Sequence, residues 1–118
     1  MGAPDAVVYK LVARADWQRA EAQGRFTGSP VDVADGFIHL STASQVADTA
    51  AKHFAGVADL LLVSISTVDV APWLRWEPSR GGALFPHVYA DLPLSAVRSV
   101  TPVPLGADGR HAFPETLA

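Results

Sequence analysis

The chain has 118 residues, of which 49% are hydrophobic and 18% charged, and it contains no cysteine. This composition predicts one globular domain that folds without crosslinks, and it excludes disulfides, thiolate metal sites and a cysteine nucleophile. The net charge of −3, with nine scattered Lys and Arg residues, argues against a long nucleic-acid duplex as a partner. The N-terminus lacks a signal-peptide pattern and no apolar run could cross a bilayer, so we expect a cytoplasmic protein without a membrane partner.

The first third of the chain predicts a strand, a helix and a loop. Val7–Ala13 alternates in hydrophobicity and is rich in β-forming residues, which predicts a strand. Asp16 can cap a short helix over Trp17–Gln23, which Gly24 would end. Arg25–Gly36 is rich in turn residues and is expected to be a loop.

A short strand and an Ala-rich helix are expected next. Phe37–Leu40 predicts the strand. Thr42 and Gln45 fit a capping box, which predicts a helix over Ala43–Phe54 that closes at Gly56.

The remainder of the chain is dominated by strands. Asp59–Ser66 is strongly apolar and is expected to be a central strand, whereas Pro78–Pro86 is expected to be a Gly-rich loop. Three further strands are expected, over Leu74–Glu77, His87–Ala90 and Val97–Val103. Residues 104–118 are expected to form a tail or a loose hairpin outside a single-domain core of about residues 7–103. Because strands and helices do not alternate regularly, the order favours an α+β fold with a largely antiparallel sheet.

Two histidine-bearing segments carry the candidate chemistry, and the first surrounds His39. Side chains alternate along a strand, so His39 and Ser41 share one face while Ile38 and Leu40 turn toward the core. The free N–H groups of the next helix favour an anion, so His39, Ser41 and the helix start at Thr42 could hold a phosphate or a ribose. The same pattern fits a helix cap beside a buried core histidine, and spacing alone does not choose between the two.

The second segment ends in His87 and Tyr89, which share a strand face by the period of two. Arg80, in the Gly-rich stretch before them, could bind a phosphate through two hydrogen bonds. Glu77 could be a general base or could accept a hydrogen bond from a ribose hydroxyl. The alternatives are an edge strand with an exposed histidine, and a carboxylate that pairs with Arg75 or Arg80.

Other histidine chemistry is less favoured by the sequence. His53, at the end of the Ala-rich helix, is expected to be a surface residue that complements the helix dipole. His39, His87 and Glu77 could bind zinc on paper, but no paired-histidine motif supports a metal site, and no metal is expected.

Several segments together resemble the bacterial DUF952 family. They are Asp35–Ser41 with Gln45, Phe85–Tyr89, Val8–Leu11 with Trp17, and Leu74–Glu77. The resemblance covers about residues 7–103. It implies an ADP-ribosyltransferase-like fold, in which split antiparallel sheets carry flanking helices.

The resemblance also implies a function, because the family is grouped with NAD-using transferases and RNA 2′-phosphotransferases that bind their ligands in a cleft between the sheets. Carried onto this chain, it implies His39 as the histidine, Glu77 as the acid and Tyr89 or Tyr9 as the aromatic ring. Together with the residues singled out above, the candidate catalytic residues are His39, Glu77, His87 and Tyr89, and the candidate ligand-binding residues are Tyr9, Lys10, Ser41, Thr42 and Arg80. The leading hypothesis is an NAD-utilising ADP-ribosyltransferase or NAD glycohydrolase with a His-lined cleft, NAD being the substrate. The alternative is a non-catalytic module that binds a nucleotide or a phosphorylated ligand.

Overall fold

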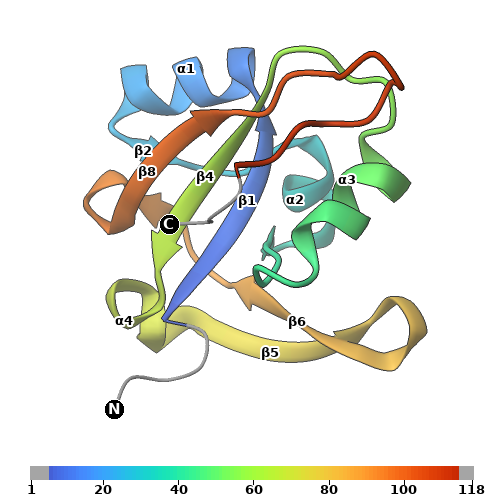
Figure 1. Cartoon of the computed structure of the whole chain (residues 1–118). Helices are drawn as coiled ribbons and strands as arrows, with labels where there is room; N and C mark the ends of the chain where they lie inside the picture. Colours follow the sequence, from blue (N-terminus) through green and yellow to red (C-terminus); the bar gives the residue numbers. More distant parts are fainter. Residues whose placement is uncertain (1–5, 115–118) are drawn as a thin grey trace.

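The strands of this chain form three small antiparallel sheets (Figure 1). A computed structural model describes residues 6–114, and the side chain of Arg80 lies outside that description. The strands are β1 Val7–Ala13, β2 Arg25–Phe26, β3 Ile38–His39, β4 Leu60–Ser66, β5 Leu74–Ser79, β6 Ala83–Val88, β7 Leu92–Pro93 and β8 Val97–Pro102. The sheets have the orders β1-β4-β8, β2-β7 and β3-β6-β5. The predicted α+β class with antiparallel pairing is confirmed.

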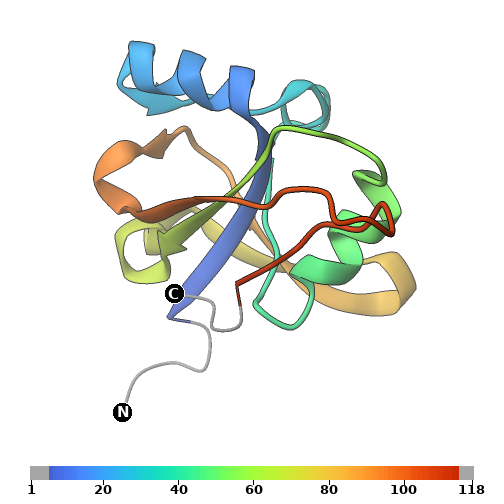
Figure 2. The ribbon, with the colours of Figure 1, turned by 45° about the horizontal axis from the view of Figure 1, so that its top comes forward.

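The helices are short and connect the strands. They are α1 Arg14–Gln23, α2 Pro30–Asp35, α3 Val46–His53 and α4 Thr67–Val70, with 3-10 turns at Ala71–Trp73, Arg80–Gly82 and Leu94–Ala96. Figures 1 and 2 both show the C-terminal hairpin beside α3, where His111 Nε2 lies 2.7 Å from the carbonyl oxygen of Val57. Among the described residues, no helix is long and apolar enough to cross a membrane.

β4 is the central strand of the first sheet, as its apolar sequence predicts. It pairs with β1 on one side and β8 on the other. Leu61, Val63 and Ile65 point into one core cluster, while Leu60 and Leu62 point into a second cluster that includes side chains of α3. Both faces of β4 are therefore covered, which explains why its sequence is a continuous apolar run instead of an alternating one.

The prediction of a loop over Arg25–Gly36 is wrong, because this segment contains β2 and the helix α2. Ser29 and Asp32 form a capping box around the first turn of α2, Pro30 occupies its start, and Gly36 ends it at a φ of 86°. These are ordinary helix signals. The helix has only six residues, however, too few to show an apolar period in the sequence.

The expected loop Pro78–Pro86 is also wrong in extent. β5 and β6 form a hairpin in which Ser79 pairs with Ala83. The turn is confined to residues 80–82, where Gly81 and Gly82 take φ values of 72° and 86°. Two glycines at positive φ allow the chain to reverse tightly, so the strands extend further than the turn-rich sequence predicts.

The two longer helices differ from the prediction at their starts. α1 begins at Arg14, and Asp16 pairs with Arg19 inside the helix instead of capping it. Residues 43–45 form a turn before α3, and the Gln45 side chain accepts the N–H of Thr42 at 3.0 Å. Only this half of the predicted capping box forms, because the Thr42 hydroxyl bonds Ser44 instead of the N–H of Gln45.

We expect truncation of Ile65 in β4 to destabilise the fold strongly. The side chain is fully buried, so Ile65→Ala should lower the free energy of unfolding by about 2–5 kcal/mol, and Ile65→Val by about 0.5–1.5 kcal/mol. Val68→Ala, at a residue of α4 that is 76% exposed, is the control and should change it by less than about 0.5 kcal/mol. Urea unfolding measures all three, and equal effects of Ile65→Ala and Val68→Ala would contradict the assignment of the core.

Candidate functional site

The two histidine segments meet in the third sheet. β3 and β6 are antiparallel, and their register sets His39 directly opposite His87. The two imidazole rings lie edge to face, with centroids 5.6 Å apart. Ile38 and Val88 form the neighbouring pair and point the other way into the core. Residues 48 positions apart in sequence thus lie side by side because strand pairing aligns them.

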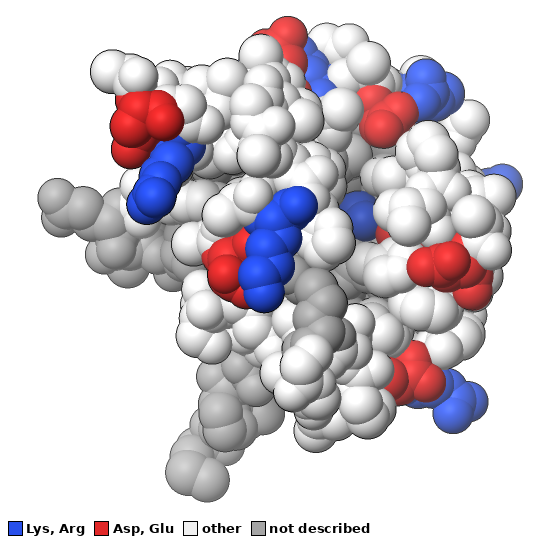
Figure 3. Space-filling view, turned by 90° about the vertical axis from the view of Figure 1, so that its right-hand side faces the viewer, with Lys and Arg blue, Asp and Glu red and all other residues white. Residues whose placement is uncertain are grey.

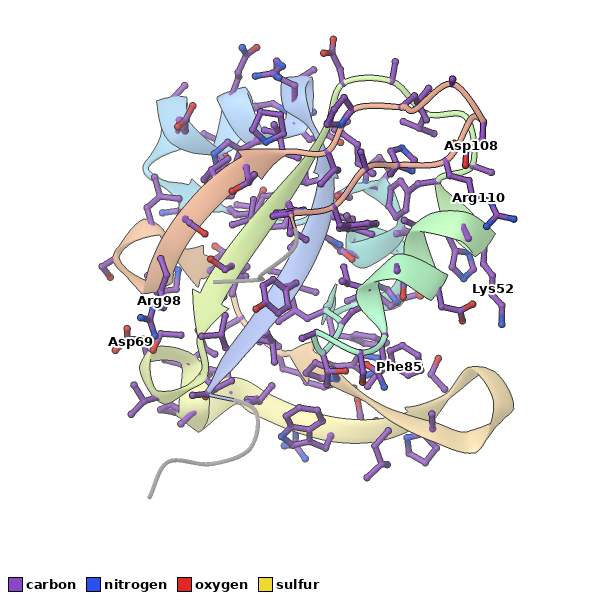
Figure 4. All side chains as sticks on the ribbon, in the orientation of Figure 1. Lys52, Asp69, Phe85, Arg98, Asp108 and Arg110 are labelled. Carbon is purple, nitrogen blue, oxygen red and sulfur yellow. The ribbon has the colours of Figure 1, made fainter. Side chains whose placement is uncertain are left out.

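A cavity of about 480 Å³ opens beside the two histidines. Its polar lining includes Tyr9, Lys10, Asp35, His39, Ser41 and His87, and its apolar lining includes Leu11, Val31, Leu40, Phe54 and Phe85. Figure 4 shows Phe85 in the space between β6 and α3, on one wall of this cavity. Figure 3 shows the right-hand side of the molecule, which is hollowed and has both blue and red atoms inside the hollow. A mostly apolar cavity with convergent polar groups is the usual form of a small-molecule site.

Asp32, from α2, is the buried charge around which one wall of the site is built. Lys10 Nζ lies 2.9 and 3.0 Å from its two carboxylate oxygens. The main-chain N–H and the ring Nδ1 of His39 lie 3.0 and 2.6 Å from Oδ1, and the N–H of Ser29 donates to Oδ2 at 2.8 Å. Lys10 also donates to the carbonyl oxygen of His39 at 3.1 Å. These contacts join β1, α2 and β3 through one carboxylate.

The pKa values of Asp32 and Lys10 are both lowered, for different reasons. Burial alone would raise the pKa of Asp32, but hydrogen bonds from His39 and the charge of Lys10 outweigh it and bring that pKa to about 2. Burial lowers the pKa of Lys10 more than Asp32 raises it. Asp32 gains the larger stabilisation because it accepts hydrogen bonds from several donors, whereas Lys10 faces one carboxylate.

A second carboxylate reaches the same histidine from the cavity side. Asp35 Oδ2 lies 2.9 Å from Nε2 of His39, so both ring nitrogens of His39 face carboxylates. Asp35 ends α2, and Gly36 in the left-handed region turns the chain directly into β3. The short connection explains how one helix supplies both carboxylates to a histidine only a few residues away.

His87 is held by a different carboxylate, on the neighbouring strand. Glu77 Oε1 lies 2.8 Å from His87 Nδ1 and accepts the hydroxyl of Tyr89 at 2.7 Å. The hydrogen bonds from Tyr89 and His87 lower the pKa of Glu77, and the bond to Glu77 raises the pKa of Tyr89. The Arg75 guanidinium lies 5.4 Å from the centre of the Tyr89 ring. Glu77 thus orients two of the predicted site residues, and neither it nor Tyr89 is among the residues that line the cavity.

Phe37 packs against the whole aromatic group. Its ring centroid lies 4.5 Å from that of His39, 4.2 Å from that of His87 and 5.2 Å from that of Tyr89. Phe37 and Tyr89 also line a smaller hollow of about 260 Å³ next to the cavity. The ring restricts the rotation of both imidazoles, and sequence reasoning assigned it no part in the site.

The other predicted residues divide between the cavity and its surroundings. Ser41 and Tyr9 form a backbone bridge through two hydrogen bonds of 2.8 Å, and both side chains line the cavity. The Ser41 hydroxyl lies 3.0 Å from that of Thr49. Thr42 bonds Ser44 in the turn before α3 and does not line the cavity. The Arg80 side chain lies outside the described residues, so its predicted role stays a prediction.

The sequence analysis assigned no part in the site to Asp32, Asp35 or His53. Asp32 lies in a segment expected to be a loop, and Asp35 belongs to a signature but received no role. His53 is exposed in the last turn of α3, as expected, and it also lines the cavity, a place that the sequence analysis did not assign to it. The capping box at Ser29 was the one available signal for Asp32, and it indicates a helix start without indicating a contact with His39. In the part of the chain that the structure describes, no group of three or more His, Cys, Asp or Glu residues could hold a metal ion.

Comparison with known proteins identifies the family. The model of the DUF952 family, described as a protein of unknown function, matches residues 11–100, so this chain belongs to that family, as the sequence resemblance predicted. The crystal structure of protein CC0527 from Caulobacter crescentus is similar, with 50% identity, a TM-score of 0.85 and coverage of 89% of this chain and 92% of that one. The solution NMR structure of CC0527 has 50% identity, a TM-score of 0.80 and coverage of 89% and 90%. A search of curated proteins found no match.

We expect Asp32 to make the fold sensitive to acid. Its pKa is about 2 in the folded chain and about 3.9 when unfolded, so between about pH 4 and pH 2 the unfolded chain binds the proton more readily. The free energy of unfolding should therefore fall by about 2 kcal/mol as the pH falls through this window. Urea unfolding of the wild type from pH 6 to pH 2 measures how steeply the free energy of unfolding falls with pH, and Asp32→Asn should make this fall smaller.

Asp48→Asn, at an exposed position of α3, is the matched control and should leave the pH dependence of the free energy of unfolding as in the wild type. An undiminished slope in Asp32→Asn would contradict the role of Asp32. If that variant does not fold, the titration of the Asp32 side-chain carbon in the wild type, followed by NMR, gives the pKa directly, and a value near 4 would contradict the prediction.

Proposed function

We propose that this chain is an NAD-utilising enzyme of the ADP-ribosyltransferase type, either a transferase or an NAD glycohydrolase, and that its His-lined cavity is the active site. The observation that carries the proposal is the facing pair of imidazoles, His39 and His87, which both line the cavity. A carboxylate orients each ring, Asp35 for His39 and Glu77 for His87. Histidines oriented in this way are typical of catalytic sites, because the fixed ring presents a known nitrogen to the substrate.

The cavity lining suits a ribosyl group attached to a flat ring. Ser41, Thr49 and Ser79 offer hydroxyls that can exchange hydrogen bonds with ribose hydroxyls. Phe54 and Phe85 offer aromatic surface for a base. We infer that the three small antiparallel sheets correspond to the split sheets of the ADP-ribosyltransferase fold, with the cavity at the cleft that these enzymes use.

The proposed chemistry is the loss of nicotinamide through a transition state with oxocarbenium character at the ribose. A carboxylate near the ribose stabilises such a positive charge, and in a site that excludes part of the solvent this stabilisation is stronger than in water. Asp35 is the carboxylate that lines the cavity, whereas Glu77 would act through His87 and Tyr89. Positioning of the substrate supplies the rest of the rate enhancement.

One observation favours a second candidate, a non-catalytic module for a nucleotide or a phosphorylated ligand. Lys10 and His39 have carboxylate partners within the chain itself. Charges that are paired within the protein need no bound ligand to be stable, so these contacts are compatible with a site that only binds. Release of nicotinamide separates the two candidates, since a binding module would show saturable binding without it.

We expect NAD and ADP-ribose to perturb the ring signals of His39 and His87 before that of His111. The first two rings line the cavity, whereas His111 contacts the carbonyl oxygen of Val57 in the C-terminal hairpin and serves as the control. The measurement is a ¹H–¹³C NMR titration of the histidine side chains, with AMP as a third ligand. Shifts limited to His111, or none at millimolar ligand, would remove the nucleotide site.

We expect Glu77→Gln to reduce nicotinamide release from NAD by about 100-fold or more, because Glu77 orients the ring of His87 and can stabilise a positive charge on it. The fold should remain intact, since the Glu77 carboxylate is partly exposed and a glutamine can keep one of its hydrogen bonds. Glu21→Gln, on the exposed face of α1, is the matched control with unchanged release. Wild-type turnover in Glu77→Gln would exclude Glu77 from the mechanism, and loss of folding would assign it a structural role.

A further inference from the structure

The two facing histidines differ in how their nitrogens are used. Both ring nitrogens of His39 lie within hydrogen-bonding distance of a carboxylate, Asp32 at 2.6 Å and Asp35 at 2.9 Å. His87 has one such contact, between Nδ1 and Glu77 at 2.8 Å. The pair is therefore asymmetric, although sequence and register treat the two residues alike.

This asymmetry determines where the protons lie. A carboxylate can only accept a hydrogen bond, so a ring with both nitrogens facing carboxylates satisfies them only when it carries two N–H groups and a positive charge. Asp32 keeps its negative charge through its other donors, Lys10 and the N–H of Ser29. His39 therefore contacts two carboxylates, of which Asp32 is buried and Asp35 is about half exposed.

His87 keeps a free nitrogen. If Nδ1 carries the proton donated to Glu77, Nε2 of the neutral ring has a lone pair. No described residue forms a hydrogen bond with Nε2. His87 is buried, with 5% of its surface exposed, and it lines the cavity. Because the ring lines the cavity, this nitrogen is available to a ligand there.

We propose that His87 is the general base of the site, that His39 is a fixed cation, and that the acceptor of the ribosyl group is therefore one that must lose a proton as it attacks, such as a hydroxyl or water. The proposal rests on the proposed function for the identity of the donor, NAD. A carboxylate acceptor would need no base, whereas a hydroxyl or water must lose a proton as it attacks. The Glu77–His87 pair has the arrangement that such a proton transfer needs.

The step balances without a further reactant. The bond between C1′ of the ribose and the pyridinium nitrogen breaks, and its electron pair leaves with nicotinamide, which becomes neutral. The acceptor oxygen forms the new bond to C1′, and its proton passes to Nε2 of His87. The imidazolium formed there is stabilised by Glu77, and the proton is then released to solvent.

The other charged groups near the two rings are consistent with the different roles proposed for His39 and His87. Lys10 is nearest His39 from β1, and its charge is balanced by Asp32. Arg75 lies opposite His87 on β5, with its guanidinium over Tyr89. His39 itself faces His87 across β3 and β6, with the ring centroids 5.6 Å apart.

The first test measures the protons without any substrate. Long-range ¹H–¹⁵N NMR of the full chain at pH 7 distinguishes a ring with two N–H groups from each neutral tautomer. We expect two N–H groups on His39 and the Nδ1–H tautomer on His87, and Asp35→Asn should return His39 to a neutral ring. A neutral His39 or a cationic His87 in the wild type would overturn the proposal, whether or not NAD is turned over.

The second test uses a nucleophile that does not need a general base. We expect His87→Ala to lower NAD hydrolysis at least 100-fold and azide, an anionic nucleophile that needs no deprotonation, to restore nicotinamide release at least 10-fold. His39→Ala should not be restored by azide. Failure of azide to restore a folded His87→Ala variant that still binds NAD would overturn the base assignment. If the wild type releases no nicotinamide, the proposed function and the acceptor assignment fail together, while the NMR result still decides the charges of the two rings.

Discussion

The carboxylate of Asp32, buried between β1, α2 and β3, is the interaction on which the site depends. A buried charge is stable only with partners, and this one accepts hydrogen bonds from Lys10, His39 and Ser29. Removing one partner of a buried ion pair typically costs about 3–5 kcal/mol, because the other charge is left uncompensated. The three elements that form the cavity wall are therefore held in one arrangement, in which His39 has little freedom to turn.

The second constraint is the register of β3 and β6. Pairing of His39 with His87 brings two imidazoles together, and Phe37 packs against both rings. A shift of one residue in either strand would turn one histidine into the core and expose Ile38 or Val88, both of which are buried. The hydrophobic core thus fixes the geometry of the polar site on the opposite face of the same strands.

These constraints give the two histidines different electrostatic surroundings, and this difference makes an enzyme the stronger proposal. A binding module needs charges and hydrogen bonds of the right sign, but it has no need for the different roles that we propose for the two rings. Pairs of titratable groups with opposed environments are typical of acid–base chemistry. Membership of the DUF952 family and the similarity to CC0527 establish the fold, and fold alone leaves the reaction open.

The sequence by itself determined the elements whose signals are local. β1 and β4 follow from apolar and β-forming runs, and the orientation of Ile38 and Leu40 toward the core follows from the period of two. Only the tertiary structure decided the partners of Asp32, since Lys10 is 22 residues away and no local period encodes that contact. It also decided that Glu77 holds His87 and Tyr89 at the edge of the cavity, because the register of β5 and β6 sets which side chains of the two strands lie together. Hydrogen bonds between distant side chains depend on how the elements pack, and packing is a property of the whole fold.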